Sequence, residues 1–115
     1  LSNLSIWKYN IQEMEKVKIL RYENGGKYKW HTDCGAKETS TRKLTAIIQL
    51  SDETKYEGGN LEFGITDKSG KNNYTAPRTR GSITIFPAFL SHRVTPITKG
   101  RRYSLITWMN GDCFV

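Results

Sequence analysis

The only two histidines of the chain, His31 and His92, are candidate metal ligands. Asp33 follows His31 by two residues, and in an extended segment two such side chains project from the same face. His92 begins a later extended segment, so closure of a barrel could bring it beside them. Two imidazoles and one carboxylate on one side of a metal such as Fe(II) leave positions open for a second ligand and for dioxygen. The spacing therefore predicts a metal site formed by His31, Asp33 and His92.

Arg102 provides a second signal. By itself, a lone His-x-Asp motif is more often a capped turn or a surface pair than a pair of ligands. Arg102 lies ten residues after His92, where we expect it to open the last strand, and its guanidinium offers a fork of donors that suits a carboxylate. Near an open metal site it could anchor a dicarboxylate, with a surface ion pair as the alternative. Arg101 would point to the opposite face and fits a surface ion pair better.

The elements that must position these residues are predicted to be strands. Turn residues recur at short intervals, and the segments between them alternate and are rich in β-branched and aromatic residues. We expect strands over 17–22, 44–50, 83–87 and 102–109, and only a weak helical pattern over 11–17. Alternation in the first strand places Lys18, Leu20 and Tyr22 on one face. About seven or eight short strands in one domain predict an all-β sandwich or barrel with few or no helices.

The length of 115 residues fits a single domain spanning residues 1–115. The chain carries 18 Lys and Arg against 11 Asp and Glu, a formal net charge of +7, which favours acidic partners without specifying one. Because these charges are spread along the chain, a solvated basic surface explains them better than a nucleic-acid footprint. Two cysteines can form at most one disulfide, and no apolar run reaches the roughly 20 residues of a membrane span. We therefore expect a cytoplasmic protein without a membrane segment.

Several blocks of sequence, in this order along the chain, resemble one known family. They are Leu20–Gly26, Trp30–Asp33, Arg42–Thr45, Tyr56–Leu61, Gly81–Pro87, His92–Pro96 and Gly100–Ser104. Together they are similar to the 2-oxoglutarate and Fe(II)-dependent dioxygenases, in the prolyl 4-hydroxylase-like branch that includes the PKHD-type hydroxylases. The resemblance covers residues 19–108 and implies the family's fold, a double-stranded β-helix or jelly-roll barrel.

The resemblance also implies roles for particular residues. The implied iron ligands are His31, Asp33 and His92. Arg102 would bind the distal carboxylate of 2-oxoglutarate, and the Tyr22 hydroxyl would help to hold this co-substrate, whereas without the family Tyr22 would equally be a core aromatic. Weaker matches place Thr84 and Trp108 in the pocket wall. The implied cofactors are Fe(II), 2-oxoglutarate and O2, with ascorbate as an optional addition.

The activity implied by the resemblance is hydroxylation of a peptidyl proline, or of a related amino acid or peptide, with release of succinate and CO2. A cupin-like module that binds a metal or a small anion without turnover is the alternative. A nucleic-acid demethylase is disfavoured, because such enzymes carry a second arginine where this chain has Trp108. A halogenase is disfavoured because its chemistry requires the carboxylate ligand to be replaced, and Asp33 is present.

The chain departs from the family pattern at its N-terminus. Members of this branch usually carry helices that pack on the larger sheet, whereas only residues 1–16 precede the first expected strand. We therefore expect a bare sheet face, covered by a missing N-terminal segment or by a second chain in a homo-oligomer. Cys34 would point away from the metal, and we interpret it as a packing thiol. The basic segment Thr66–Gly81 is predicted to contact an anionic peptide or small-molecule substrate, with a solvated disordered loop as the alternative.

Overall fold

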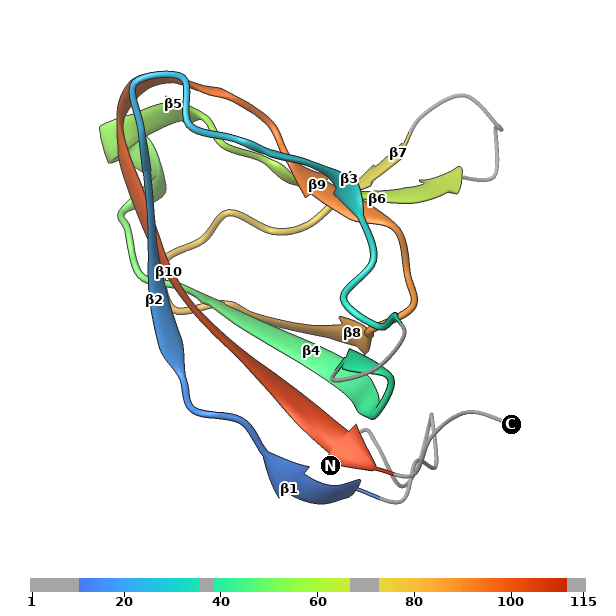
Figure 1. The fold of residues 1–115 in the computed structure, drawn as a ribbon. Helices are drawn as coiled ribbons and strands as arrows, with labels where there is room; N and C mark the ends of the chain where they lie inside the picture. Colours follow the sequence, from blue (N-terminus) through green and yellow to red (C-terminus); the bar gives the residue numbers. More distant parts are fainter. Residues whose placement is uncertain (1–10, 36–38, 67–72, 112–115) are drawn as a thin grey trace.

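The structure, a computed structural model, describes residues 11–35, 39–66 and 73–111 (Figure 1). Within these residues the strands form two antiparallel sheets, one of six strands and one of four. The larger sheet contains β1 (Ile11–Met14), β2 (Lys18–Glu23), β4 (Arg42–Gln49), β5 (Tyr56–Gly58), β8 (Ile83–Pro87) and β10 (Ile97–Gly111). The smaller sheet contains β3 (Tyr28–His31), β6 (Leu61–Thr66), β7 (Asn73–Thr75) and β9 (His92–Val94). The two sheets face each other as a jelly-roll barrel, which confirms the predicted fold class.

The longest strand, β10, organises the larger sheet. It pairs with β4 over residues 104–110 and with β2 over residues 101–106, while its two ends pair with β5 and β1. Strand β8 extends the sheet beyond β4. In the smaller sheet the order is β3-β9-β6-β7, so the segments that carry His31 and His92 are neighbours. The candidate site residues therefore lie on both walls of one barrel.

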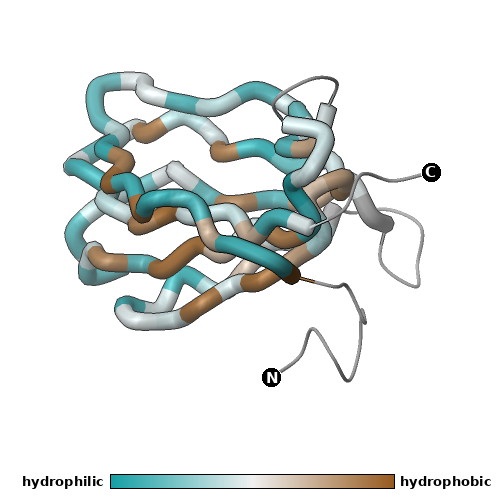
Figure 2. Tube along the Cα trace, turned by 60° about the horizontal axis from the view of Figure 1, so that its bottom comes forward, coloured by the Kyte–Doolittle hydropathy of each residue, from teal (hydrophilic) through white to brown (hydrophobic). Residues whose placement is uncertain are grey.

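Strand alternation directs the candidate pocket residues to the inside of this barrel. The cross-strand pairs of β2 and β10 are Tyr22 with Arg102, Leu20 with Ser104, and Lys18 with Ile106. Residues opposite each other in an antiparallel pair share a face, and Tyr22, Arg102 and Ser104 are buried on this one. Figure 2 shows the alternation of hydrophobic and hydrophilic residues along the strands. The predicted grouping of Lys18, Leu20 and Tyr22 is confirmed, because all three line one cavity.

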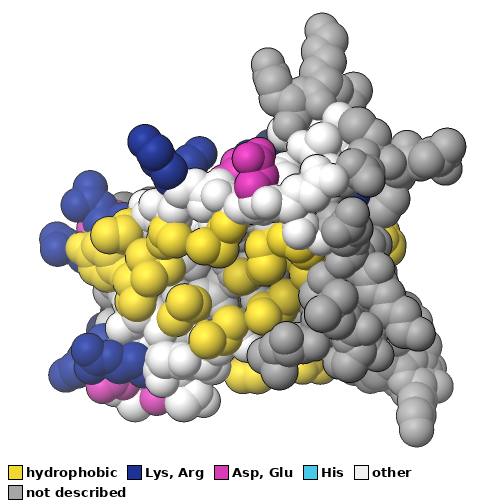
Figure 3. Space-filling model, turned by 90° about the horizontal axis from the view of Figure 1, so that it is seen from below, with side chains coloured by type: hydrophobic (Ala, Val, Ile, Leu, Met, Phe, Trp, Pro, Cys, Tyr) yellow, Lys and Arg dark blue, Asp and Glu magenta, His cyan; other side chains and the backbone are white. Residues whose placement is uncertain are grey.

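The outer face of the larger sheet is apolar and exposed. Ile19, Leu105, Ile48 and Ile83 lie side by side across four strands. Ile19 and Ile83 are 68% and 60% exposed, and Figure 3 shows hydrophobic side chains gathered over this face. Large patches of this kind are uncommon on soluble monomers. The bare face expected from the sequence is thus seen in the described part of the chain, and its cover by another segment or chain stays a prediction.

Three segments differ from the sequence-based expectation. Residues Ile11–Met14 form a strand rather than a helix, because they pair with the end of β10. The last strand begins at Ile97 and not at Arg102, with Gly100 at a φ of 75° allowing the backbone to continue past the expected turn. The basic segment contains a short strand, β7, and its residues 67–72 lie outside the described residues. No helix in the described ranges is long and apolar enough to cross a membrane.

Candidate active site

The two histidines face each other across neighbouring strands of the smaller sheet. His31 at the end of β3 is the register partner of His92 at the start of β9, and their ring centroids lie 4.2 Å apart. The Nδ1 atom of His31 lies 2.6 Å from the carbonyl oxygen of Lys29, and Nδ1 of His92 lies 2.8 Å from that of Leu90. A proton on each Nδ1 satisfies these carbonyls and leaves both Nε2 lone pairs available to a metal.

Asp33 reaches the histidines from a bend rather than from a strand. Strand β3 ends at His31, and the backbone N–H groups of Asp33 and Cys34 both donate to the carbonyl of Ala88, at 2.8 and 3.2 Å. The extended backbone that the spacing argument assumed therefore ends before Asp33, but the Asp33 side chain still lies beside the two histidines. Its Oδ1 atom lies 3.3 Å from Nε2 of His31 and 3.4 Å from Nε2 of His92. The three candidate ligand atoms lie within 4.8 Å of one another.

Thr45 fixes the second oxygen of this carboxylate. Its hydroxyl donates to Oδ2 of Asp33 at 2.6 Å, and the residue is completely buried on the inner face of β4. The bond leaves Oδ1 as the oxygen that faces the two histidines. We did not predict Thr45 from the sequence, since the apolar residues that identify this strand, Leu44 and Ala46, have the opposite parity. The opposite parity places Thr45 on the other face of the strand, and this was the signal in the sequence that could have identified it.

The electrostatic balance of the cluster keeps Asp33 ionised. Burial acts to raise the pKa of Asp33, but the contacts of its carboxylate with the His31 and His92 rings and the hydrogen bond from Thr45 outweigh it and hold the pKa far below its ordinary value. Burial acts to lower the pKa of His31, whereas its contacts with Asp33 and the Lys29 carbonyl more than compensate and raise it. One carboxylate and two imidazoles are a donor set that suits a divalent transition metal.

Arg102 forms the opposite end of the same cavity. It lies in the middle of β10, is 1% exposed, and its guanidinium is 5.2 Å from the centroid of the Tyr22 ring. Its Nε and Nη2 groups have no hydrogen-bond partner, and burial lowers the pKa of this arginine. Burial also raises the pKa of Tyr22. A buried guanidinium with unpaired donors is costly unless an anion binds it, so this end of the cavity is suited to a carboxylate.

The glycine turn between β5 and β6 makes room for Arg102. Gly58 and Gly59 have φ values of 76° and 62°, a region that favours glycine. A Cβ atom on Gly59 would overlap the Ile97 side chain and come within 3.1 Å of the Arg102 side chain. The two glycines thus form the turn between these strands and leave space for the Arg102 side chain.

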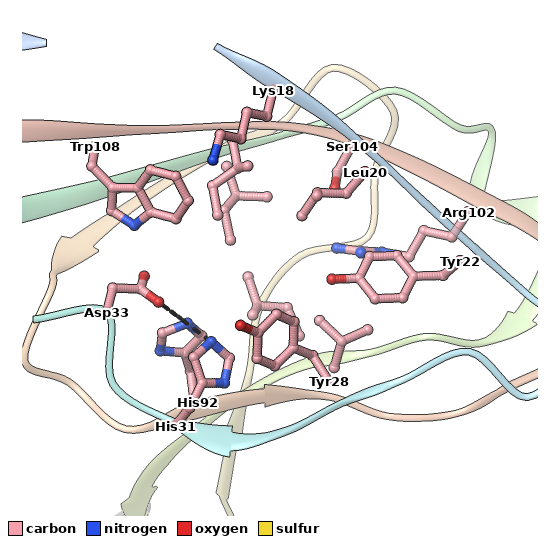
Figure 4. A pocket seen from close by; sticks show the side chains of 14 residues that line it. Lys18, Leu20, Tyr22, Tyr28, His31, Asp33, His92, Arg102, Ser104 and Trp108 are labelled. Carbon is pink, nitrogen blue, oxygen red and sulfur yellow. Dashed lines mark ion pairs between the residues drawn. The ribbon is translucent and has the colours of Figure 1, made fainter. Parts of the chain in front are cut away.

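A cavity of about 220 Å³ connects the two ends (Figure 4). The histidine and aspartate cluster lies on one side of it, and Arg102 with Tyr22 lies on the other. Trp108 lines the cavity, as expected, whereas Thr84 is not among the residues that line it. Cys34 belongs neither to the cavity wall nor to the ligand cluster, and its thiol lies 3.8 Å from the Ser40 carbonyl oxygen.

Arg78 contradicts part of the expectation for the basic segment. Its guanidinium donates to the carbonyls of Gly58 and Tyr56, at 2.7 and 3.2 Å, and to the side chain of Asn60. It also lies 4.3 Å from the centroid of the Tyr56 ring. Arg78 is therefore a structural residue that braces the turn behind Arg102, and not a loop cation available to a substrate.

Comparison with known proteins agrees with this geometry. The sequence profile of the 2OG-Fe(II) oxygenase superfamily matches residues 17–110. A PKHD-type hydroxylase of Idiomarina loihiensis is 32% identical over 98 residues, which cover 85% of this chain and 43% of that protein. The crystal structure of a Pseudomonas putida prolyl-4-hydroxylase superposes with a TM-score of 0.78 at 20% identity, covering 95% of this chain and 59% of that one. A Trichoplax adhaerens prolyl hydroxylase, solved with a hypoxia inducible factor peptide, superposes with a TM-score of 0.71 at 18% identity, covering 90% and 46%.

The chain belongs to the 2OG-Fe(II) oxygenase superfamily, since the family profile covers most of its length. It spans about 43% of the length of the curated relatives that it matches first. The similarity to prolyl hydroxylase structures, at 20% identity or less in these two cases, establishes the jelly-roll fold.

Proposed function

We propose that this chain is the catalytic domain of an Fe(II) and 2-oxoglutarate-dependent hydroxylase, in which His31, Asp33 and His92 hold the iron. One observation carries the proposal: a single cavity has a two-histidine, one-carboxylate cluster at one end and a buried guanidinium with unpaired donors at the other. When bound, Fe(II) supplies the activation of dioxygen that is coupled to conversion of 2-oxoglutarate into succinate and CO2.

The contribution of the protein is to hold and orient the reactants. The carbonyls of Lys29 and Leu90 orient the two imidazoles, and the Thr45 hydroxyl orients the carboxylate. Arg102 would bind the distal carboxylate of 2-oxoglutarate through two N–H groups, beside the Tyr22 ring. Apolar side chains such as Ile47, Leu61 and Ile106 line much of the cavity, and a wall of low polarity strengthens these charged contacts.

A peptidyl proline, or a closely related amino-acid or peptide residue, is the proposed substrate. The names of the relatives support hydroxylation, and the neighbour solved with a peptide fragment supports a cavity that opens to a peptide. Neither the proposed cofactor set nor the ligand roles depend on this choice, because they follow from the two ends of the cavity.

The test is formation of succinate from 2-oxoglutarate by the purified protein with Fe(II) and O2, followed by NMR. We expect succinate from the wild type and none from His92→Ala, and at least about 100-fold weaker Mn(II) binding by that variant, because it loses a direct ligand. Cys34→Ala is the control and should bind Mn(II) like the wild type. Binding of metal and 2-oxoglutarate without any succinate would favour a cupin-like binding module instead.

A further inference from the structure

We propose that Lys18 and Trp108 form a subsite for an anionic group of the prime substrate, so that the molecule to be hydroxylated carries a carboxylate close to the reacting carbon. This inference rests on the proposed function and adds the chemical class of its substrate. It concerns the part of the cavity wall that neither the metal cluster nor Arg102 occupies.

Lys18 stands at the rim of the cavity and faces inward. It begins β2, opposite the buried Ile106 of β10, and it lines the same cavity as the metal cluster. Its Nζ atom lies 5.4 Å from the centroid of the Trp108 ring, a cation–π contact that holds the amine over the cavity. Figure 4 shows the Lys18 amine projecting into the cavity near Trp108, away from Arg102.

Both groups have unused hydrogen-bonding capacity. Among the described residues, Lys18 forms no ion pair and no hydrogen bond within normal distances. The indole Nε1 of Trp108 is buried without a partner, on a residue that is only 9% exposed. Buried donors are nearly always paired in native proteins, so an unpaired indole N–H at a cavity wall points to a ligand.

Arg42 also lies beside Trp108, but unlike Lys18 its side chain is paired with a carboxylate. The Arg42 guanidinium also lies against the Trp108 ring, at 3.8 Å, but it donates to both oxygens of Glu15 at 2.8 and 3.0 Å. Its charge is therefore already compensated. The Lys18 charge also helps to lower the pKa of Glu15, but Lys18 forms no ion pair with it, so its ammonium stays available to an incoming anion.

A carboxylate fits these two donors better than a neutral group does. The Lys18 ammonium can bind a carboxylate oxygen through a charge-assisted hydrogen bond, and the indole N–H, on the ring edge that faces Asp33 in Figure 4, can donate to a second polar atom of the same molecule. Arg102 lies at the far side of the cavity, where we assign it to 2-oxoglutarate, so the Lys18 subsite would serve the second reactant. The carboxylate could belong to an acidic side chain next to the target residue or to a free chain terminus, and the two sources are separable by experiment.

The experiment measures binding of paired probes to the Mn(II)-loaded protein with 2-oxoglutarate present. One set comprises acetylated, amidated pentapeptides with a central proline, carrying either Glu or Gln directly before or after it. The other pair is L-proline and L-prolinamide. We expect at least one acid to bind about tenfold more tightly than its matching amide, as for a hydrogen bond to a charged group. Tighter binding of a Glu peptide than of its Gln counterpart identifies an acidic side chain as the anionic group. Tighter binding of L-proline than of L-prolinamide identifies a terminal carboxylate.

Substitution of Lys18 then assigns the preference to the subsite. Lys18→Gln should reduce the acid-to-amide ratio to below about twofold, whereas Lys18→Arg should retain it. Lys16→Gln, which removes the same charge two residues away, is the matched control and should keep the wild-type ratio. Trp108→Phe keeps an aromatic ring under the amine but removes the N–H, and should lower the affinity for the acid severalfold.

Three results would overturn the inference: no acid binds better than its amide, the ratio survives in Lys18→Gln, or this variant loses tenfold or more of its affinity for 2-oxoglutarate. The last would mean that Lys18 holds the co-substrate. If the wild type binds neither Mn(II) nor 2-oxoglutarate, the proposed function itself fails and the subsite falls with it. If it binds both and the ratio is near one, only the subsite is wrong.

Discussion

The two ends of the cavity are built in opposite ways. At the histidine end, the polar atoms that do not face the cavity centre already have partners within the chain: the Nδ1 atoms lie on the Lys29 and Leu90 carbonyls, and Oδ2 of Asp33 accepts from Thr45. At the other end, Arg102 leaves its Nε and Nη2 nitrogens unpaired and Ser104 leaves its hydroxyl unpaired. The first end is organised before any ligand arrives, whereas the second depends on a ligand to satisfy it. Substitutions at the Arg102 end should therefore weaken ligand binding without lowering the stability of the apoprotein. Substitutions at the histidine end should disturb contacts that are already present in the apoprotein.

The largest effect is expected at the unsatisfied end. Arg102→Met should weaken 2-oxoglutarate binding by about 2 to 5 kcal/mol, because it removes a charge-assisted contact in a buried site. The free energy of unfolding of the apoprotein should stay constant or rise, since an unpaired buried charge is replaced by an apolar chain of similar volume. Calorimetric titration and thermal unfolding measure the two quantities.

Two further variants control this prediction. Arg102→Lys should restore only part of the affinity, because lysine lacks the planar fork. Arg101 is exposed on the other face of β10, where it pairs with Glu23 at 2.6 Å, and Arg101→Met should leave 2-oxoglutarate binding unchanged. An Arg102→Met protein that unfolds readily yet binds 2-oxoglutarate normally would show that the guanidinium is structural and would remove the contrast between the ends.

A smaller effect is expected at the organised end. Thr45→Val replaces the hydroxyl that holds Asp33 with a methyl group of similar size, and should lower Mn(II) affinity about 10- to 100-fold, as for other residues that orient a ligand. Thr45→Ser should recover most of the loss because it keeps the hydroxyl. The affinity is read from Mn(II) titration by electron paramagnetic resonance. Equal affinities for the valine variant and the wild type would mean that Asp33 needs no such support.

The smallest effect concerns the ion pair behind the metal cluster. Hydrogen bonds from Arg42 lower the pKa of Glu15, and Arg42 also contacts the Asp33 backbone carbonyl at 3.4 Å. Because the folded pKa is depressed, this pair stabilises the protein above the ordinary glutamate pKa and loses its effect as pH falls through the folded value. Glu15→Gln should cost about 1 kcal/mol at neutral pH, and this difference should shrink as the pH falls below the ordinary glutamate pKa of 4.5.

Denaturant unfolding of both proteins across this pH range tests the prediction about Glu15. The matched comparison is Glu13→Gln, in β1 two residues before Glu15, for which no ion pair is seen among the described residues. If the free energy of unfolding of Glu15→Gln differed from that of the wild type by the same amount at all pH values, the stabilisation would not come from the charge of the Glu15 carboxylate.

The sequence was most informative where a rule depends on parity or on residue type. Alternation separated the inward Arg102 from the outward Arg101, and it grouped Tyr22 with Lys18 on the inner wall of β2. Residue type alone made His31 and His92 candidates, because the chain contains no others. These inferences need only local geometry, because successive side chains in any strand point to opposite faces of the sheet.

The failures arose where contacts distant in sequence decide the structure. The apolar spacing of Ile11 and Met14 is compatible with a helix, but pairing with β10 makes the segment a strand. Asp33 leaves the strand because the Ala88 carbonyl accepts from its backbone N–H, a partner 55 residues away that spacing cannot reveal. Arg78 looked like a free loop cation and is instead held by the turn at Gly58. Each outcome depends on tertiary contacts that override local preference.

Strand β10 carries Arg102, Ser104 and Trp108 on one face, so that the contacts proposed for both reactants come from a single continuous segment. A single inserted or deleted residue between Arg102 and Trp108 would turn every later side chain to the opposite face of the sheet. Trp108 would then lie on the apolar exterior and Met109 or Thr107 in the cavity. Single substitutions within these seven residues therefore keep the strand register, whereas an insertion or a deletion destroys the cavity wall.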